Sequence, residues 1–295
     1  MTSPVASPFF APGLSAFAKD YDAFIIDLWG VIHDGTRAYP GAAAALGALK
    51  AQGKRTVLLT NAPRLSGSVI AQMEGLGLGR DLYDAVMTSG DAVNAELLRR
   101  DDPFFQGLGQ ACLFVGPERD TNVLTDTGVA LVTDPAKAAF VLCTGPVSFE
   151  ESVADYAVLL EACAARGLPM VCANPDRAVV REGKTVICAG ALADFYAGLG
   201  QTVVSRGKPD PAIYRLALER LDLPAGARVA AIGDGVHTDM PGARAAGVDA
   251  VFVTGGLNAE PLGIHHGEVP DQGKVRALLD AHALTPKMAI PAFVW

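Results

Sequence analysis

The sequence lacks the cysteine pattern of a disulfide-bonded or zinc-binding protein. Its 295 residues include only five cysteines, an odd number, and no two of them form a CxxC pair. Most of them lie in apolar segments, where a free thiol behaves as a small hydrophobic side chain. We therefore expect reduced, buried thiols, as in a cytosolic protein, and neither disulfides nor a zinc site. These residues are Cys112, Cys143, Cys163, Cys172 and Cys188.

The chain also lacks long apolar runs and any excess of positive charge. No stretch approaches the ~18 apolar residues of a membrane-spanning helix, and the N-terminus has no basic segment leading into an apolar one. We therefore expect neither a membrane span nor a secretory signal, and a cytoplasmic location. The 24 Lys and Arg residues against 32 Asp and Glu give a net charge of -8. Such a protein has no basic field to attract nucleic acid or an anionic membrane, so an anionic substrate would require a local metal ion or lysine.

What the sequence does have is many short apolar segments at regular spacing. Half of its residues are hydrophobic, and the chain is long enough for one large or two medium domains. Between residues 21 and 89, segments that predict strands alternate with segments that predict helices. This alternation is typical of right-handed βαβ units around a parallel sheet. The predicted strands are 23–26, 55–59 and 85–89, and the predicted helices are 40–51 and 65–76.

A second α/β segment interrupts the first. From about residue 90 to residue 200 the sequence predicts further strands and helices, and the first unit then resumes with a strand at 202–205. We predict an α/β fold with a Rossmann-like, doubly wound parallel-sheet core formed by residues 1–88 and 202–295. Residues 89–201 are predicted to form an inserted α/β cap domain. The tail beyond residue 256 shows no clear pattern.

Polar side chains follow several of the predicted core strands. Because the carboxyl ends of parallel strands meet at one edge of a sheet, these side chains are expected to converge there. Each one alone also fits an ordinary turn or helix cap, but their shared position favours a site. Carboxylates are ligands of Mg²⁺, a lysine adds a charge against an anion, and an aspartate is a competent nucleophile toward phosphoryl groups. The residues are Asp27, Thr60, Asn61, Lys208, Asp234 and Asp239.

The same residues carry a resemblance to a known family. The segments Asp27-Leu28-Trp29-Gly30-Val31, Leu59-Thr60-Asn61, Gly207-Lys208-Pro209 and Gly233-Asp234…Thr238-Asp239 resemble, in order, the four motifs of the haloacid dehalogenase superfamily. The insert between the second and third motifs resembles the large α/β cap of class IIA members. These members include sugar-phosphate, nucleotide, phosphoglycolate and pyridoxal phosphatases. The resemblance covers nearly the whole chain and implies a hydrolase that acts on a small phosphorylated metabolite, such as a sugar phosphate or nucleotide.

The resemblance also implies catalytic and metal-binding roles. Asp27 would be the nucleophile, forming an aspartyl-phosphate that water then cleaves, and Lys208 would offset the repulsion between carboxylates. The implied cofactor is Mg²⁺, held by Asp27, Asp234 and the main-chain carbonyl of Trp29. Asp239 would support the water shell of the metal.

Substrate contacts are implied on both domains. Thr60, Asn61 and Lys208 of the core would hold the phosphate. The cap would select the rest of the substrate, and its large apolar surface could also pair two subunits in a homodimer. Three charged residues of the cap could contact the leaving group, or they could simply belong to a turn and point into solvent. These residues are Asp176, which follows Asn174-Pro175, then Arg177 and Arg181.

Trp29 departs from the family pattern. Phosphatases of this superfamily carry Asp-x-Asp, and the second aspartate protonates the leaving group and then activates water. Trp29 occupies that position here. An indole offers only a weakly acidic N–H and does not titrate near neutral pH, whereas a general acid or base contributes typically ~10²–10⁴-fold to the rate.

Three functions are compatible with this departure. The first is a Mg²⁺-dependent phosphatase of weak or narrow activity, with His33 or Asp34 as a candidate replacement for the missing acid. The second is a dehalogenase-like displacement at carbon, which needs no acid, although the retained metal-binding aspartates and the large cap favour phosphate. The third is a non-catalytic protein that binds a phosphorylated ligand in a regulatory role.

Overall fold

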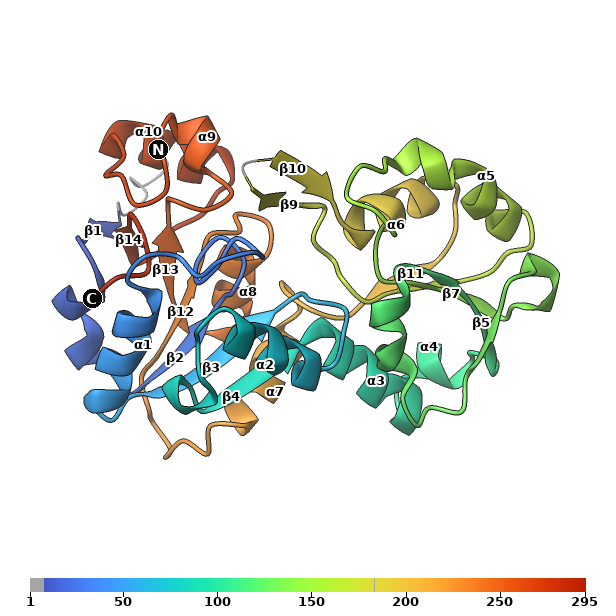
Figure 1. Cartoon of the computed structure of the whole chain (residues 1–295), viewed down its shortest axis with the longest axis horizontal. Coiled ribbons are helices and arrows are strands. Elements are labelled where there is room, and N and C mark those ends of the chain that lie inside the picture. Colours follow the sequence, from blue (N-terminus) through green and yellow to red (C-terminus); the bar gives the residue numbers. More distant parts are fainter. Residues whose placement is uncertain (1–7, 183) are drawn as a thin grey trace, which may run out of the picture.

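Two parallel sheets form the centres of two lobes, one from the two ends of the chain and one from its middle (Figure 1). The structure, a computed structural model, describes residues 8–182 and 184–295. The two lobes correspond to the predicted core and cap, and the prediction of an α/β fold with a doubly wound parallel-sheet core is confirmed.

The core sheet has seven parallel strands in the order β1-β14-β13-β12-β2-β3-β4. Strand β2, next to the central strand β12, pairs with β3 on one side and with β12 on the other, so the strand order reverses there. In such sheets the carboxyl ends of the strands at the reversal form the ligand-binding crevice. The strands are β1 (Phe9–Phe10), β2 (Ala23–Ile26), β3 (Arg55–Thr60), β4 (Ala85–Thr88), β12 (Val229–Gly233), β13 (Asp249–Val253) and β14 (Met288–Ile290).

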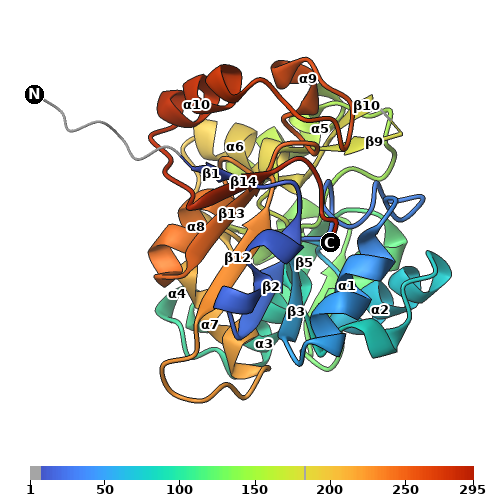
Figure 2. The same ribbon diagram turned by 90° about the vertical axis from the view of Figure 1, so that its left-hand side faces the viewer.

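Helices cover both faces of the core sheet, α1 and α2 on one side and α7 and α8 on the other (Figure 2). Strand β2 is buried on both faces because its side chains alternate. Phe24 and Ile26 pack with α1 and α2, whereas Ala23 and Ile25 pack with α7 and α8. The core helices are α1 (Ala42–Ala51), α2 (Ser66–Gly75), α7 (Pro211–Glu219), α8 (Asp239–Ala246), α9 (Ala259–Leu262) and α10 (Gln272–Ala281), with short 3₁₀ helices η1 (Leu14–Ala16), η2 (Ala18–Asp20) and η3 (Arg80–Leu82).

The cap has its own five-stranded parallel sheet, in the order β11-β8-β7-β5-β6. The strands are β5 (Ala111–Val115), β6 (Ala130–Val132), β7 (Phe140–Cys143), β8 (Met170–Cys172) and β11 (Val203–Ser205). Its helices are α3 (Ser89–Arg99), α4 (Pro103–Gln106), α5 (Val153–Ala164) and α6 (Ala189–Gly198), with η4 (Glu118–Leu124) and η5 (Pro135–Lys137). Our assignment of the strand at 202–205 to the core was wrong, because β11 pairs with β8 at the edge of the cap sheet.

A two-stranded hairpin, β9 (Ala178–Arg181) and β10 (Lys184–Ile187), leaves the cap and extends back toward the core (Figure 1). The sequence predicted only its second strand. Two of its side chains, Val179 and Val186, and the neighbouring Cys188 are buried in a small cluster against which Trp29 of the core packs. The hairpin therefore lies over the edge of the core sheet at which the carboxyl ends of its strands meet.

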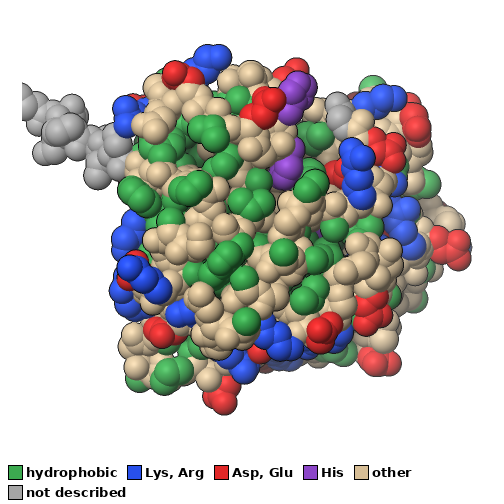
Figure 3. Space-filling model, turned by 60° about the vertical axis from the view of Figure 1, so that its left-hand side comes forward, with side chains coloured by type: hydrophobic (Ala, Val, Ile, Leu, Met, Phe, Trp, Pro, Cys, Tyr) green, Lys and Arg blue, Asp and Glu red, His purple; other side chains and the backbone are tan. Residues whose placement is uncertain are grey.

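The tail beyond residue 256 is more ordered than its sequence indicated. It contributes α9, α10 and β14, and β14 pairs with both β13 and the N-terminal strand β1. On the face of the core that includes these terminal segments, charged side chains of both signs surround scattered hydrophobic ones (Figure 3).

Two expectations about the whole chain can be compared with the structure. All five cysteines are free and buried, as predicted. Within residues 8–182 and 184–295, none of the helices combines the length and the apolar character that crossing a bilayer would require.

Candidate active site

Asp27 lies at the carboxyl end of β2, where the order of the core strands reverses. Its main-chain N–H donates to the carbonyl of Ile232 at 2.9 Å, which continues the pairing of β2 with β12 by one residue. The side chain is only 6% exposed. A short buried strand thus delivers this carboxyl group to the ligand-binding edge of the sheet, as the sequence predicted.

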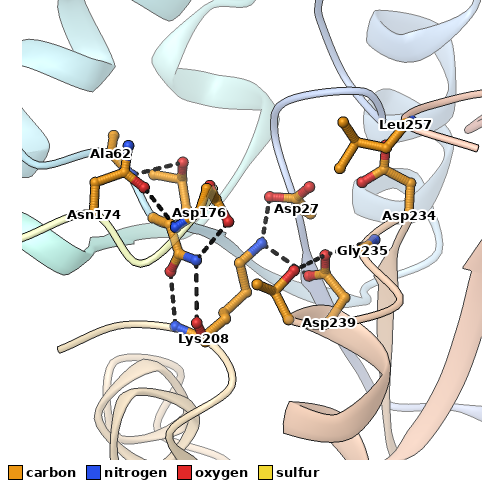
Figure 4. A network of polar contacts seen from close by, with 12 residues as sticks. Asp27, Ala62, Asn174, Asp176, Lys208, Asp234, Gly235, Asp239 and Leu257 are labelled. Carbon is orange, nitrogen blue, oxygen red and sulfur yellow. Dashed lines mark hydrogen bonds and ion pairs between the residues drawn. The ribbon is translucent and has the colours of Figure 1, made fainter. Parts of the chain in front are cut away.

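The four motifs converge around Lys208 (Figure 4). Its Nζ atom lies 2.6 Å from Asp27 Oδ1 and 2.8 Å from Asp239 Oδ1. Oxygen atoms of Asp27, Asp234 and Asp239 all lie within 4.8 Å of one another, and the three side chains are buried. The predicted nucleophile, lysine and acidic residues therefore form one cluster.

This cluster carries an excess of negative charge. Burial raises the pKa of Asp27 well above its usual range, Lys208 opposes this shift, and the carboxylates of Asp239 and Asp234 add to it. Burial and the neighbouring Asp239 likewise raise the pKa of Asp234 to about 7. Burial alone would lower the pKa of Lys208, but the carboxylates of Asp239 and Asp27 outweigh it and hold the ammonium group charged. Three carboxylates against one lysine leave a deficit of positive charge that a divalent cation would balance.

The donor set fits a hard divalent cation such as Mg²⁺. Mg²⁺ binds through one or two carboxylates, water and substrate phosphate, and the three aspartates provide oxygen ligands only. Asp239 already accepts hydrogen bonds from Lys208 Nζ and, at 3.1 Å, from the N–H of Gly235. Asp27 accepts from the same Nζ atom and Asp234 from the N–H of Leu257, so these hydrogen bonds do not distinguish the three carboxylates. The division into Asp27 and Asp234 as direct ligands and Asp239 as a support stays a prediction.

Backbone packing fixes the orientation of Asp234. The N–H of Leu257 donates to Asp234 Oδ2 at 2.6 Å, and Asn258 Nδ2 donates to the Asp234 carbonyl at 2.7 Å. A Cβ atom on Gly30 or Gly256 would lie 2.1 Å or 1.8 Å from the same carboxyl oxygen. Glycine at both positions therefore lets two loops close around this carboxylate.

The loop that contributes Gly256, Leu257 and Asn258 was not predicted to belong to the site. It directly follows β13, so it starts at the same edge of the sheet as the other motifs. The pair Gly255-Gly256 after a buried strand was the sequence feature that could have indicated it. No charged residue marks this strand end, so the sequence did not predict that the loop belongs to the site.

Asn61 connects the core to the cap rather than facing the site cavity. Its Oδ1 accepts from the N–H of Lys208 at 2.7 Å, and its Nδ2 donates to the Lys208 carbonyl at 3.2 Å and to Asp176 Oδ1 at 2.9 Å. The predicted contact of the Asn61 side chain with phosphate would have to displace one of these bonds. Thr60 lines the site cavity, with its hydroxyl accepting from the N–H of Ala62 at 3.2 Å. Both phosphate contacts stay predictions.

The acidic cluster opens into a cavity of about 830 Å³ between core and cap. Asp27, Lys208, Asp234 and Asp239 line one end of it, and the hairpin β9–β10 lines another part. Asp176 of the cap also lines this cavity, at the position where the sequence predicted a contact with substrate. The volume suits a small metabolite with room for solvent.

Trp29 packs between the motif loop and the hairpin of the cap. Its indole contacts the cluster of Val179, Val186 and Cys188, and a Cβ atom on Gly35 would lie 2.2 Å from its ring. The ring also makes an edge contact with His33, with a centroid distance of 5.2 Å. Trp29 is thus a wall of the site cavity and a contact between core and cap.

Neither candidate replacement for the missing acid has suitable surroundings. His33 is 1% exposed, burial lowers its pKa to about 4, and its Nδ1 accepts from the N–H of Gly35. Burial would raise the pKa of Asp34, but hydrogen bonds from Thr36 and Arg37 outweigh it and lower the pKa to about 2. At neutral pH His33 is therefore the neutral imidazole, whose remaining N–H is a very weak acid, and Asp34 is an ionised carboxylate, so neither can act as a general acid.

We predict that Mg²⁺ stabilises the folded protein through the acidic cluster. At about 100 times its dissociation constant, a ligand that binds only the folded state adds about 2.7 kcal/mol to the free energy of unfolding. Thermal unfolding with and without Mg²⁺ measures this effect. Asp234→Asn should remove most of the stabilisation, whereas Asp194→Asn, on a half-exposed carboxylate paired with Arg177, should retain it. Equal stabilisation of both variants would contradict a metal site here.

Comparison with known proteins supports this assignment of motifs. Two family models described as haloacid dehalogenase-like hydrolase match the chain, over residues 24–130 and 123–247. A solved hydrolase of the haloacid dehalogenase-like family from Brucella suis 1330 is 35% identical and covers 97% of this chain and 100% of its own, with a TM-score of 0.81. The chain belongs to the haloacid dehalogenase-like hydrolase family, as a class IIA phosphatase-like member.

Two further relatives carry more specific names. The chain is 28% identical to the ribonucleotide monophosphatase NagD of Escherichia coli (strain K12) over 235 residues, or 80% of this chain and 88% of the relative. It is 26% identical to a solved glycerol phosphate phosphatase from Mycobacterium tuberculosis in complex with magnesium, with a TM-score of 0.63. That match covers 88% of this chain and 78% of the other.

Proposed function

We propose that the protein is a Mg²⁺-dependent phosphatase that removes phosphate from a small phosphorylated metabolite, a sugar phosphate or a nucleotide, through an aspartyl-phosphate. The observation that carries this proposal is the position of Asp27, which combines a buried carboxylate, a lysine at 2.6 Å and two further aspartates at one sheet edge. The names of the relatives support the substrate class.

The proposed reaction has two steps. An oxygen of Asp27 attacks phosphorus, the bond from phosphorus to the ester oxygen breaks, and the alcohol part of the substrate leaves. Water then attacks the aspartyl-phosphate, which releases inorganic phosphate and restores Asp27. Lys208 balances negative charge throughout, and Mg²⁺, held by Asp27 and Asp234 with support from Asp239, would neutralise charge on the phosphoryl oxygens.

Trp29 is expected to limit the rate of this reaction. In the first step the leaving oxygen has to take its proton from water, because the side chain at this position cannot donate one near neutral pH. In the second step no carboxylate at this position activates the attacking water. We therefore propose low rates, or a preference for substrates whose leaving group needs little protonation.

A panel assay tests the proposed function. Purified protein is incubated with a set of phosphorylated metabolites, with and without Mg²⁺, and release of inorganic phosphate is measured. Phosphate release that requires Mg²⁺ is the expected result. Release of halide from haloacids without metal would instead indicate dehalogenase-like displacement, and thermal stabilisation by a phosphorylated ligand without turnover would indicate a binding protein.

A further inference from the structure

A second cavity, of about 310 Å³, lies on the other side of Trp29 from the metal-binding aspartates. Three residues, Trp29, Asp176 and Val179, line both this cavity and the site cavity, so they form the boundary between the two. The two cavities therefore adjoin at Trp29, next to the cavity that Asp27 lines.

Three arginines from three separate elements line the second cavity. Arg64 comes from the loop after β3 of the core, Arg119 from η4 of the cap, and Arg181 from the end of β9 in the hairpin. The two carboxyl groups in its lining are Asp120 and Asp176. Residues distant in sequence and on both domains thus bring guanidinium groups to one cavity.

Two of these arginines, Arg64 and Arg181, have no carboxylate partner in the described part of the chain that would neutralise their charge. Arg64 Nη2 donates to the neutral amide oxygen of Gln72 at 2.7 Å, and the guanidinium of Arg181 lies over the ring of Phe149 at 4.2 Å. Among residues 8–182 and 184–295, neither of these two arginines forms an ion pair. Stacking on a ring leaves the N–H groups in the plane of the guanidinium able to donate.

Arg119 has a carboxyl neighbour, but the contact is long. Its Nε lies 3.8 Å from Asp120 Oδ1, beyond hydrogen-bond distance. The cavity therefore keeps donors and positive charge for a ligand.

Charge is divided between the two cavities. The site cavity holds most of the acidic side chains, and its second basic group, Arg37, is bound to Asp34 at 3.2 Å. A phosphate ester seated on Asp27 and Lys208 would meet uncompensated positive charge only beyond Trp29, within the residues that the structure describes.

We propose that the second cavity is a subsite for an anionic group on the leaving part of the substrate, so that the preferred substrates carry a carboxylate or a second phosphate besides the ester that is cleaved. This inference rests on the proposed phosphatase function for the seating of the first phosphate. Arg64, Arg119 and Arg181 bind the second anion through charge-assisted hydrogen bonds, and the apolar faces of Trp29 and Val179 contact the carbon atoms between the two anions.

Binding to the Asp27→Asn variant tests the subsite independently of turnover. Isothermal titration calorimetry in Mg²⁺ compares 3-phosphoglycerate with glycerol 3-phosphate, which differ in a carboxylate, and fructose 1,6-bisphosphate with fructose 1-phosphate, which differ in a phosphate. We expect at least one of the two ligands with a second anionic group to bind about 10- to 100-fold more tightly than its partner, the range for charge-assisted hydrogen bonds. The arm that shows the preference identifies the second anion as carboxylate or phosphate.

Arginine variants locate the preference. Adding Arg181→Gln or Arg119→Gln to Asp27→Asn should reduce this preference to less than about threefold, while affinity for the partner ligand with a single anionic group stays the same. Arg177→Gln is the matched control, because Arg177 belongs to the same cap segment but pairs with Asp194 at 2.6 Å and lies outside both linings. Equal affinity within both pairs, or a preference that survives both arginine variants, would overturn the subsite. If the ligand with a second anionic group binds more tightly but the unmodified protein releases no phosphate, the proposed hydrolysis is refuted and the proposed subsite is still supported.

Discussion

Replacing Asp27 with asparagine is expected to lower Mg²⁺-dependent phosphate release by about 10⁴-fold or more, because an amide cannot form the aspartyl-phosphate. The change keeps the shape of the side chain and its main-chain pairing to Ile232. Steady-state phosphate release on the best substrate of the panel measures the loss. A variant that keeps more than about a tenth of the activity would exclude Asp27 as the nucleophile.

The same variant should not lose stability, and this separates chemistry from folding. Three buried carboxylates surround Lys208, and Lys208 keeps its contact with Asp239 at 2.8 Å after the substitution. Removing one like charge from a buried cluster relieves repulsion, whereas an unpaired buried lysine would be costly. We expect Asp27→Asn to unfold at the same temperature as the unmodified protein or higher in the absence of metal. A lower unfolding temperature would mean that the loss of activity reports misfolding.

Replacing Trp29 with aspartate is expected to raise phosphatase activity by about 10²-fold or more, because it supplies the general acid and base that the family pattern has at this position. The gain should appear in kcat and should be largest for substrates with poorly acidic leaving groups. It should come with lower thermal stability, since the indole packs against the hairpin cluster of Val179, Val186 and Cys188.

Trp29→Phe is the control for this prediction. Phenylalanine keeps an aromatic contact with the hairpin and adds no titratable group, so activity should stay within about threefold of the unmodified protein. If Trp29→Asp folds, binds Mg²⁺ and shows no gain over Trp29→Phe, the low activity expected of this protein does not come from a missing acid.

Sequence alone was sufficient for the parts of this protein that local patterns encode. Strand β2 could be predicted because four apolar residues in a row suit a strand buried on both faces, and Asp27 follows it directly. Asp27 and Asp234 directly follow core strands, Asp239 follows the turn after β12, and parallel strands bring such positions to one edge. Lys208 instead follows β11 of the cap sheet, so its motif indicated its place in the site but the strand rule did not. That geometric rule, together with the four motifs, located the charged centre of the site.

What the sequence did not reveal depends on contacts between distant segments. Strand β11 was assigned to the core because its apolar residues suit either sheet, and only its pairing with β8 places it in the cap. Strand β14 and the loop at Gly256 lie in a tail without strong periodicity, and their roles come from pairing with β13 and packing on Asp234. The phosphate contact of Asn61 stays a prediction, whereas the link that its side chain makes between Lys208 and Asp176 across the two domains became visible only in the structure.

Trp29 shows most clearly what can be inferred from the sequence and what requires the tertiary structure. From the sequence it is a missing acid, a conclusion that follows from the chemistry of the indole at one position. Only the tertiary structure adds that it packs against the hairpin of the cap and lies between an acidic cavity and an arginine-lined one. Side-chain chemistry is a property of the residue and can be inferred from one position, whereas its neighbours depend on how the cap closes over the core.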